Sequence, residues 1–239
     1  MPFLIALILI VAIAVAYLKT PKGRGWFGEL CVKMVIGKNK PGVKYVLNDL
    51  KLRISDEKTS QIDHILINKK GIFVIETKNY SGRIYGQENQ LEWTQVLNYG
   101  KVKNKLYNPV KQNKTHIYHI SNIIGEKLPI HSVIVFVQGN VQYISANGIY
   151  TLQGLKKLVK NGANTLSSEQ MASIYGKICE ANDRSINKFE HIRNIDTLKL
   201  NVTNNICPRC GKNLIVRHEK NGDFMGCEEY PNCKFTKKI

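Results

Sequence analysis

Residues 61–78 read QIDHILINKKGIFVIETK, and this stretch decides the fold of the 239-residue chain. Two runs rich in β-branched residues flank the polar pair Lys69-Lys70, which indicates a β-hairpin with a two-residue turn. Such a turn places Asn68 opposite Gly71. Most other side chains on both faces of the two runs are apolar. The sequence therefore predicts a hairpin buried near the centre of a sheet.

Four polar side chains collect at the open end of this hairpin. In the expected register Asp63 lies opposite Glu76 and Gln61 lies opposite Lys78. All four share one face, because side chains alternate along a strand. Carboxylates that face each other across a strand pair repel, at Cβ separations of about 4.5–5.5 Å. A bound Mg²⁺ or Mn²⁺ would relieve that repulsion, so Asp63 and Glu76 are the predicted metal ligands.

This combination of groups suits the cleavage of phosphodiester bonds. A divalent cation polarises a phosphate and lowers the pKa of an attacking water. The lysine orients that water or stabilises the charge that develops. The alternative is a salt-bridged trio of Asp63, Glu76 and Lys78 that only stabilises the edge of the sheet. The strongly apolar remainder of the hairpin favours the catalytic interpretation.

The same residues resemble a known family. An acid followed by E-x-K on adjacent strands is similar to the PD-(D/E)xK nuclease superfamily, and residues 26–138 look like its nuclease-related domain (NERD). Ile62 precedes Asp63 where that motif has proline, so the literal motif is incomplete. The residues that carry the resemblance are Gly28-Glu29, QIDHI (61–65), GIFVIETK (71–78), Tyr80-Ser81-Gly82, Trp93, Asn108-Pro109 with Gln112, and 133–136.

This resemblance implies a restriction-endonuclease-like α/β fold over residues 21–140, in which helices flank a mixed sheet. It also implies catalytic roles. Glu29 on the first helix adds a carboxylate on the metal side, Asp63 and Glu76 bind magnesium or manganese, and Lys78 is the catalytic lysine.

Two further groups of side chains are candidates to contact the substrate. Gln112 and His116 lie one turn apart on a helix expected after Pro109. They either reach the site, to contact phosphate or a metal-bound water, or remain solvated. Aromatic and basic side chains also alternate in one segment, either to stack on bases beside a basic strip or as part of an ordinary amphipathic hairpin. These are Trp93, Tyr99 and Tyr107 with Lys101, Lys103 and Lys105.

The charge balance is strongly basic. The chain has 35 Lys and Arg against 18 Asp and Glu, a formal net charge of +17. Such a surplus favours polyanionic partners, either nucleic acid or anionic lipid, over a merely well-solvated surface.

An uninterrupted apolar run, FLIALILIVAIAVAYL, occupies residues 3–18. As a helix it would span roughly 24 Å, so residues 1–20 are expected to form a transmembrane anchor. Lys19, Lys22 and Arg24 follow at once. The positive-inside rule therefore predicts a single-pass protein of the cell membrane with a cytoplasmic body. A cleaved signal peptide and a buried core helix are the alternatives.

Four cysteines cluster at the C-terminus, in residues 206–239. Their spacing is C-x₂-C, sixteen residues, then C-x₅-C, which matches a closed structural zinc site. So small a module needs the metal to fold. Two disulfides in an exported protein are the alternative. The predicted zinc ligands are Cys207, Cys210, Cys227 and Cys233.

This module resembles the C4 zinc finger found at the C-termini of bacterial DNA topoisomerases. The matching residues are CPRCG at 207–211, Phe224, Gly226-Cys227, Tyr230-Pro231 and Cys233. The resemblance implies binding of DNA, with single strands the expected form. The side chains expected to contact the DNA are Arg209, Arg217, Phe224 and Tyr230.

The rest of the chain yields coarser expectations. Residues 19–25 are expected to form a polar linker, and 141–205 a helical extension of the core or a spacer before the zinc finger. Helices are expected at 26–37, 110–124, 151–160 and 168–193, and further strands at 44–54, broken near Asn48-Asp49, and at 132–138.

Together these features predict a membrane-anchored, metal-dependent deoxyribonuclease that grips DNA with a zinc finger. The main alternative is a non-enzymatic, membrane-tethered nucleic-acid-binding protein with a vestigial nuclease site. A weaker one has the basic face bind anionic lipid.

Overall fold

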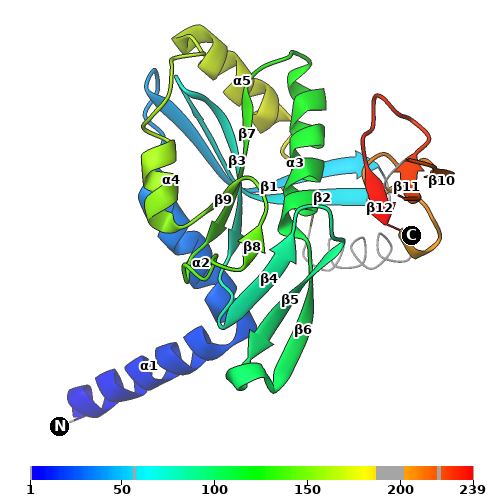
Figure 1. Cartoon of the computed structure of the whole chain (residues 1–239). Helices are drawn as coiled ribbons and strands as arrows, with labels where there is room; N and C mark the ends of the chain where they lie inside the picture. Colours follow the sequence, from blue (N-terminus) through cyan, green and yellow to red (C-terminus); the bar gives the residue numbers. More distant parts are fainter. Residues whose placement is uncertain (1, 56–57, 187–201, 220–221, 239) are drawn as a thin grey trace.

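A five-stranded mixed sheet organises the nuclease-like part of the chain (Figure 1). The computed structural model describes residues 2–55, 58–186, 202–219 and 222–238. The sheet order is β1-β2-β3-β7-β9; β1, β2 and β3 are antiparallel, and β3, β7 and β9 are parallel. The bounds are β1 Lys44–Ser55, β2 Lys58–Asn68, β3 Gly71–Lys78, β7 Ile130–Phe136 and β9 Ile149–Tyr150.

Helices cover both faces of this sheet. One face packs against α3 and α5, and the other packs against α2 and α4. The predicted α/β class, with helices flanking a mixed sheet, is therefore confirmed. The helices are α1 Pro2–Lys19, α2 Pro21–Ile36, α3 Pro109–Ile124, α4 Leu152–Leu158 and α5 Ser168–Glu180.

The central hairpin has the predicted turn and register. Asn68 pairs with Gly71, and the regular pairing continues as far as His64 and Ile75. Beyond that point the Asp63 side chain replaces a ladder bond, because its Oδ2 accepts from the Thr77 N–H at 2.8 Å. The two strands thus separate where the polar residues begin, which opens this end of the hairpin.

A second, smaller sheet includes, as β5 and β6, the amphipathic hairpin that was the alternative interpretation of the segment around Trp93 and Tyr107; the rest of the sheet was not expected. Its order is β6-β5-β4-β8, and its inner side packs through the buried Trp93 and Ile84 onto Ile134 and Phe136. A 3₁₀ turn, η1 (Asn98–Gly100), joins β5 to β6. The bounds are β4 Arg83–Gln87, β5 Glu92–Leu97, β6 Val102–Tyr107 and β8 Ile144–Ser145.

Three expectations about element bounds were wrong. Residues 21–25 are helical, because Thr20 caps the Gly23 N–H at 3.0 Å and Pro21 suits the first turn. β1 is continuous, since Asp49 adopts a φ of 53° without interrupting the pairing on either side. The helix expected at 168–193 ends at Glu180, and its part at 187–193 lies outside the described residues.

Residues 141–180 join the core: β8 and β9 extend the two sheets, and α4 and α5 pack onto the central one. The remainder of the expected extension at 141–205 includes 187–201, which lie outside the described residues.

The N-terminal helix α1 projects from the body, and its apolar side chains are exposed (Figure 1). Among the described residues, no single helix is long and apolar enough to cross a membrane by itself. Taken together, the helices Phe3–Lys19 and Pro21–Ile36 have the length and composition of a membrane span, but they are bent by 92° relative to each other.

The cysteine module is a three-stranded unit docked against the nuclease-like body. Lys58 on β2 donates to the Arg209 carbonyl at 2.8 Å, and Lys111 on α3 donates to the Thr236 carbonyl at 2.9 Å. The Arg209 guanidinium also lies 5.8 Å from the Tyr118 ring. The strands are β10 Leu214–Arg217, β11 Phe224–Cys227 and β12 Thr236–Lys238.

We predict that Gly86→Ala destabilises the second sheet. A Cβ at this position would lie 2.2 Å from Cδ2 of the buried Trp93, and overpacking of this kind costs about 1–3 kcal/mol. Urea denaturation measures the change. Gly176→Ala in α5 is the control, because its Cβ would meet nothing within 4 Å and should add roughly 0.5–1 kcal/mol of helix stability. Equal stability of the Gly86→Ala variant and the wild type would contradict the close packing.

Candidate active site

Lys78 lies at the centre of the predicted site. Its Nζ donates to Glu76 Oε1 at 2.7 Å and to Gln112 Oε1 at 3.1 Å. Glu76 and Lys78 project from the same face of β3, two residues apart, and Gln112 comes from the first turns of α3. The structure thus brings three of the predicted residues into direct contact.

Helix α3 is fixed so that Gln112 points at Lys78. The buried Asn108 caps its start by accepting from the Val110 N–H at 2.9 Å, and Pro109 occupies the first turn. One residue beyond Gln112, the Asn113 amide donates to the Val74 carbonyl at 2.9 Å and to Ser132 Oγ at 3.0 Å. Sequence reasoning missed Asn113, although a buried asparagine beside a site residue is a usable signal.

His116 joins the site from the next turn of α3. Its Nδ1 is 2.9 Å from Ser60 Oγ, and its Nε2 faces Glu76 Oε2 at 3.4 Å. That second separation is too long for a good hydrogen bond, and neither atom has a hydrogen-bond partner among the described residues. A buried nitrogen and a buried carboxylate oxygen therefore face each other with spare bonding capacity. Ser60 gave no signal in the sequence.

Glu29 and Asp49 complete the acidic surroundings. Glu29 lies on α2 and pairs with Lys33 at 3.8 Å. Burial raises the pKa of Glu29, Lys33 lowers it, and the nearby Asp49 and Glu76 raise it. Asp49 falls opposite Asp63, between the pairs Asn48–His64 and Leu50–Ile62. The sequence interpretation treated Asp49 only as a strand break, and its polar side chain in an apolar strand was the missed signal.

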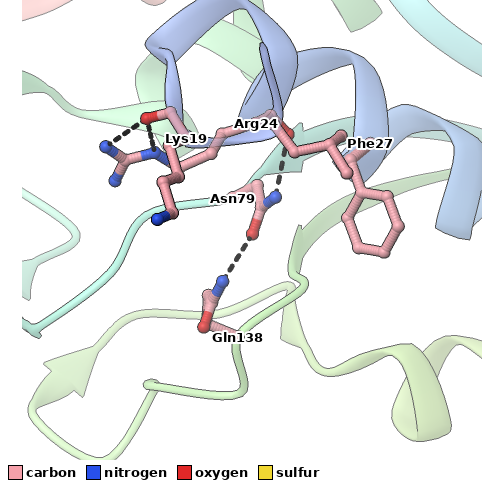
Figure 2. Close-up of a pocket in the computed structure, with 6 residues that line it drawn as sticks. Lys19, Arg24, Phe27, Asn79 and Gln138 are labelled. Atoms are coloured by element: carbon pink, nitrogen blue, oxygen red, sulfur yellow. Dashed lines mark hydrogen bonds between the residues drawn. The ribbon is translucent and has the colours of Figure 1, made fainter. Parts of the chain in front are cut away.

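A close helix–strand approach places Glu29. A Cβ on Gly28 would lie 2.8 Å from the Asn79 Cβ, so the glycine lets α2 pass next to the end of β3. Figure 2 shows the cleft of about 310 Å³ beside this crossing. In it Asn79 Nδ2 donates to the Arg24 carbonyl at 2.8 Å and Gln138 Nε2 donates to Asn79 Oδ1 at 3.1 Å. These bonds tie the start of α2 to the site strand.

The two buried carboxyls of the site are in opposite electrostatic states. Asp63 keeps some exposure as a residue, but its carboxyl is enclosed, and burial followed by the Glu76 charge raises its pKa well above the usual value. Burial acts the same way on Glu76, but Lys78 and then His116 outweigh it and lower the pKa. Burial would lower the pKa of Lys78, and Glu76 raises it instead. The site thus holds a stable Glu76–Lys78 ion pair beside an Asp63 carboxyl whose ionised form is unfavourable.

The donor types suit a hard divalent cation. Glu76 Oε2 is buried without a hydrogen-bond partner among the described residues, and Mg²⁺ is commonly held by one or two carboxylates together with water and substrate phosphates. The acids are not tightly gathered. Among the described residues, the ligand atoms of the four cysteines all lie within 4.8 Å of one another, and no set of three or more His, Asp or Glu side chains is gathered as closely. Asp63 and Glu76 could therefore supply only part of an ion's coordination.

The cysteine cluster, by contrast, has the geometry of a closed site. Cys207 and Cys233 Sγ atoms are 3.7 Å apart, and those of Cys210 and Cys227 are 3.3 Å apart. Four ligands at about 2.3 Å from zinc in a tetrahedron lie at comparable separations. The described chain holds its six cysteines as free thiols, so the predicted disulfide alternative finds no support in the geometry.

The side chains predicted to contact DNA lie in two different environments. Arg209 is only 9% exposed and packs between the rings of Tyr118 and Phe235, at 5.8 and 5.9 Å. Tyr230 is 60% exposed, and the Arg217 guanidinium lies 5.4 Å from its ring. Phe224 is partly buried on β11. Tyr230 is therefore available to a partner, Arg217 is half-buried and donates to the Cys227 carbonyl at 3.1 Å, and Arg209 joins the module to α3.

Comparison with known protein families identifies two separate units in the chain. Residues 24–137 match the model of the nuclease-related domain, and residues 204–239 match the model of the topoisomerase DNA-binding C4 zinc finger. Both resemblances drawn from the sequence are confirmed, and the cysteine module is a zinc ribbon.

Several individual proteins are similar to parts of the chain. An uncharacterized protein of Bacillus anthracis is 35% identical over 182 residues, which are 72% of this chain and 84% of that protein. DNA topoisomerase 1 of Methanocaldococcus jannaschii is 52% identical over 34 residues, 14% of this chain and 4% of the topoisomerase. The uncharacterized protein YrdD of Escherichia coli is 42% identical over 36 residues, 15% of this chain and 20% of YrdD. No solved structure matches the chain.

We predict opposite stability effects for the two carboxyls without added divalent metal. Because the pKa of Asp63 is raised in the folded protein, its carboxyl stabilises the fold below about pH 4. This stabilisation is lost as the pH rises through the pKa that Asp63 has in the folded state. Asp63→Asn should therefore raise the melting temperature at pH 7.5, with little gain at pH 4. The pKa of Glu76 is lowered in the folded protein, so the Glu76 carboxylate stabilises the fold above about pH 4. This stabilisation is lost as the pH falls through the pKa that Glu76 has in the folded state.

Glu76→Gln should lower stability at pH 7.5 by about 3–5 kcal/mol, because it leaves Lys78 buried without its counter-ion. Thermal melting and urea denaturation of the two variants measure both effects. A lower melting temperature for Asp63→Asn at pH 7.5, or unchanged stability for Glu76→Gln, would refute this account of the site.

Proposed function

This chain belongs to the nuclease-related domain (NERD) family, and we propose that it hydrolyses phosphodiester bonds of DNA with the help of a divalent metal ion. The observation that carries the proposal is the contact of Lys78 with both Glu76 and Gln112, at 2.7 and 3.1 Å. The contact joins the E-x-K pair of β3 to a glutamine on a separate helix. A structural ion pair would need Glu76 alone.

The side chains divide the work of the proposed reaction. Lys78 stays protonated, since Glu76 raises its pKa. Two of its three N–H groups point to Glu76 and Gln112, so the third can donate to a phosphate oxygen and stabilise the negative charge that grows there.

Asp63 and Glu76 are the residues that would hold Mg²⁺ or Mn²⁺, with Glu29 as the further acidic group of the site. A bound ion of this kind supplies positive charge that polarises the phosphate and acidifies water. Its charge would also relieve the repulsion that raises the pKa of Asp63.

DNA as the substrate rests on the zinc ribbon and on the charge of the chain. The ribbon matches the topoisomerase DNA-binding type, and it leaves the Tyr230 ring, with the Arg217 guanidinium 5.4 Å away, open to a partner. The net charge of +17 favours a polyanion. We infer that the ribbon holds DNA, single strands in particular, while the site on β3 cuts it.

We predict metal-dependent cleavage that requires the site residues. The full chain in neutral detergent is incubated with single- and double-stranded DNA in the presence of Mg²⁺ or Mn²⁺. Lys78→Ala and Asp63→Asn should each reduce the cleavage rate by about a hundredfold or more. Lys157→Ala, an exposed position on α4, is the control and should cut like the wild type. Cleavage that survives both site substitutions would rule out this site.

One observation favours a second candidate function. Among the described residues, the acids near Lys78 do not come together as closely as metal ligands do. A non-enzymatic nucleic-acid-binding protein with a vestigial site is the corresponding alternative. It requires salt-sensitive DNA binding and no cleavage by the wild type with any divalent metal, so the same assay decides between them.

We also propose that α1 anchors the chain in the cell membrane as a single pass, with the body on the cytoplasmic side. The helix presents apolar side chains to its surroundings along its length, from Phe3 at 90% to Val15 at 46% exposure. Lys19, Lys22 and Arg24 follow it directly. No contact within the described body covers this surface, which a bilayer would bury.

We predict that the full chain floats with neutral phosphatidylcholine liposomes and that deletion of residues 2–18 abolishes flotation, because the apolar surface is removed. The N-terminus of the inserted protein should be protected from external protease when the body is accessible. Flotation of the deletion variant with anionic vesicles alone would instead identify the basic surface as the lipid contact. Its failure to float with either would support the anchor.

A further inference from the structure

The second sheet has one face that nothing in the described protein covers. We name as the outer face the side chains that the pairing of β4, β5 and β6 places on that side. Arg83, Val96 and Lys103 form one cross-strand row, and Tyr85, Thr94 and Lys105 form the next. An open groove of about 1220 Å³ lies over these residues. The sheet therefore buries one side in the core and presents the other to solvent.

The outer face is positively charged where the groove runs. Arg83, Lys103 and Lys105 line it, and all three are exposed. No Asp or Glu belongs to the groove lining in the described structure. Cationic side chains without local counter-ions are costly to gather unless an anionic partner neutralises them. The charge of the groove thus matches a chain of phosphates.

Tyrosine side chains gather at the same face. Of the six tyrosines that are exposed in the described residues, four lie on or beside this sheet. Tyr85 stacks on Tyr143 with ring centroids 4.7 Å apart, and Arg83 lies 6.0 Å from the Tyr143 ring. These flat, solvent-facing rings resemble a platform for stacking. The four are Tyr85, Tyr99, Tyr107 and Tyr143.

Tyr99 is held out at the tip of the β5–β6 connection. The backbone of Asn98, Tyr99 and Gly100 has φ values of 49°, 55° and 97°. A left-handed conformation is unfavourable for a bulky residue, yet the Tyr99 ring is fully exposed and recovers nothing from packing. Strain that projects an aromatic ring into solvent is consistent with a contact made to a ligand.

The groove adjoins both functional units. Its lining begins at Ser81, three residues after Lys78, so their Cα atoms are at most about 11 Å apart. At the end of β6, Tyr107 lies near enough to Arg209 of the zinc ribbon to feel its charge. The outer face therefore lies between the ribbon and the strand that carries the candidate active site.

We propose that the outer face binds single-stranded DNA, with Arg83, Lys103 and Lys105 on the phosphates and Tyr99 stacked on a base. A single strand is the occupant because its bases are free to stack, and exposed aromatic rings beside basic side chains are the common way to hold one. The inference deepens the proposed function, since it assigns the surface that delivers a strand to Lys78. It shares with that proposal the assumption that DNA is the partner.

Binding of a fluorescein-labelled oligothymidylate to the full chain in neutral detergent tests the proposal, without added divalent metal so that nothing is cut. Tyr99→Ala should weaken binding by about tenfold, and Tyr99→Phe should bind like the wild type. Lys103→Gln with Lys105→Gln should weaken binding and reduce the salt slope by about 0.7 for each phosphate that the protein no longer neutralises. Because these side chains are exposed, the substitutions leave the core intact.

The matched control is Lys156→Gln with Lys157→Gln, which removes the same charge from exposed positions on α4. Equal losses of affinity in the control and the Lys103/Lys105 variant would overturn the proposal, as would unchanged binding by Tyr99→Ala. Unlabelled duplex that competes as well as the single strand would overturn the choice of occupant. Binding is measured without divalent metal and cleavage is measured with it, so a wild-type chain that binds the oligothymidylate through this face but cuts no DNA speaks against the proposed reaction and leaves the binding surface standing.

Discussion

The buried ion pair of Glu76 and Lys78 is the interaction on which the rest of the structure depends. Two charges removed from water at the end of a central strand are stable only when each is held by further groups. Lys78 meets this need through Gln112 Oε1, and the second carboxylate oxygen of Glu76 faces His116 Nε2 at 3.4 Å. Both partners come from α3, so the helix is bound to the sheet by electrostatics at its start and by apolar packing at its end.

The hairpin could be predicted from the sequence because its information is local. The turn at Lys69-Lys70 and the alternation of apolar residues determine its register without help from the rest of the chain. The positions of Glu29, Asp63, Glu76 and Lys78 on their elements followed from that alternation and from the family resemblance. Their separations did not, since the side chain of Asp63 takes a backbone partner and opens the hairpin.

Apart from its β5–β6 hairpin, the second sheet could not be predicted, and neither could the docking of the ribbon, because both depend on contacts between distant segments. β8 has two residues and pairs with β4 across more than fifty positions of sequence, which leaves no periodic signal. Ser60 was missed for the same reason, since it acquires its role from His116 on another element. Arg209 reads as a surface residue, but Tyr118 and Phe235 enclose it once the ribbon is in place.

Adjacent residues of α3 face two different units. Lys111 holds the zinc ribbon through the Thr236 carbonyl, and Gln112 holds Lys78. A ribbon of this type is usually regarded as an independent unit, which can be added to a protein or removed from it without consequence for the neighbouring domains. Here both units contact the same turn of α3, so a change in one contact surface acts on the other unit. Exchange of this ribbon for another would require a matching surface on α3, and the graft would be constrained by the nuclease-related half of the protein.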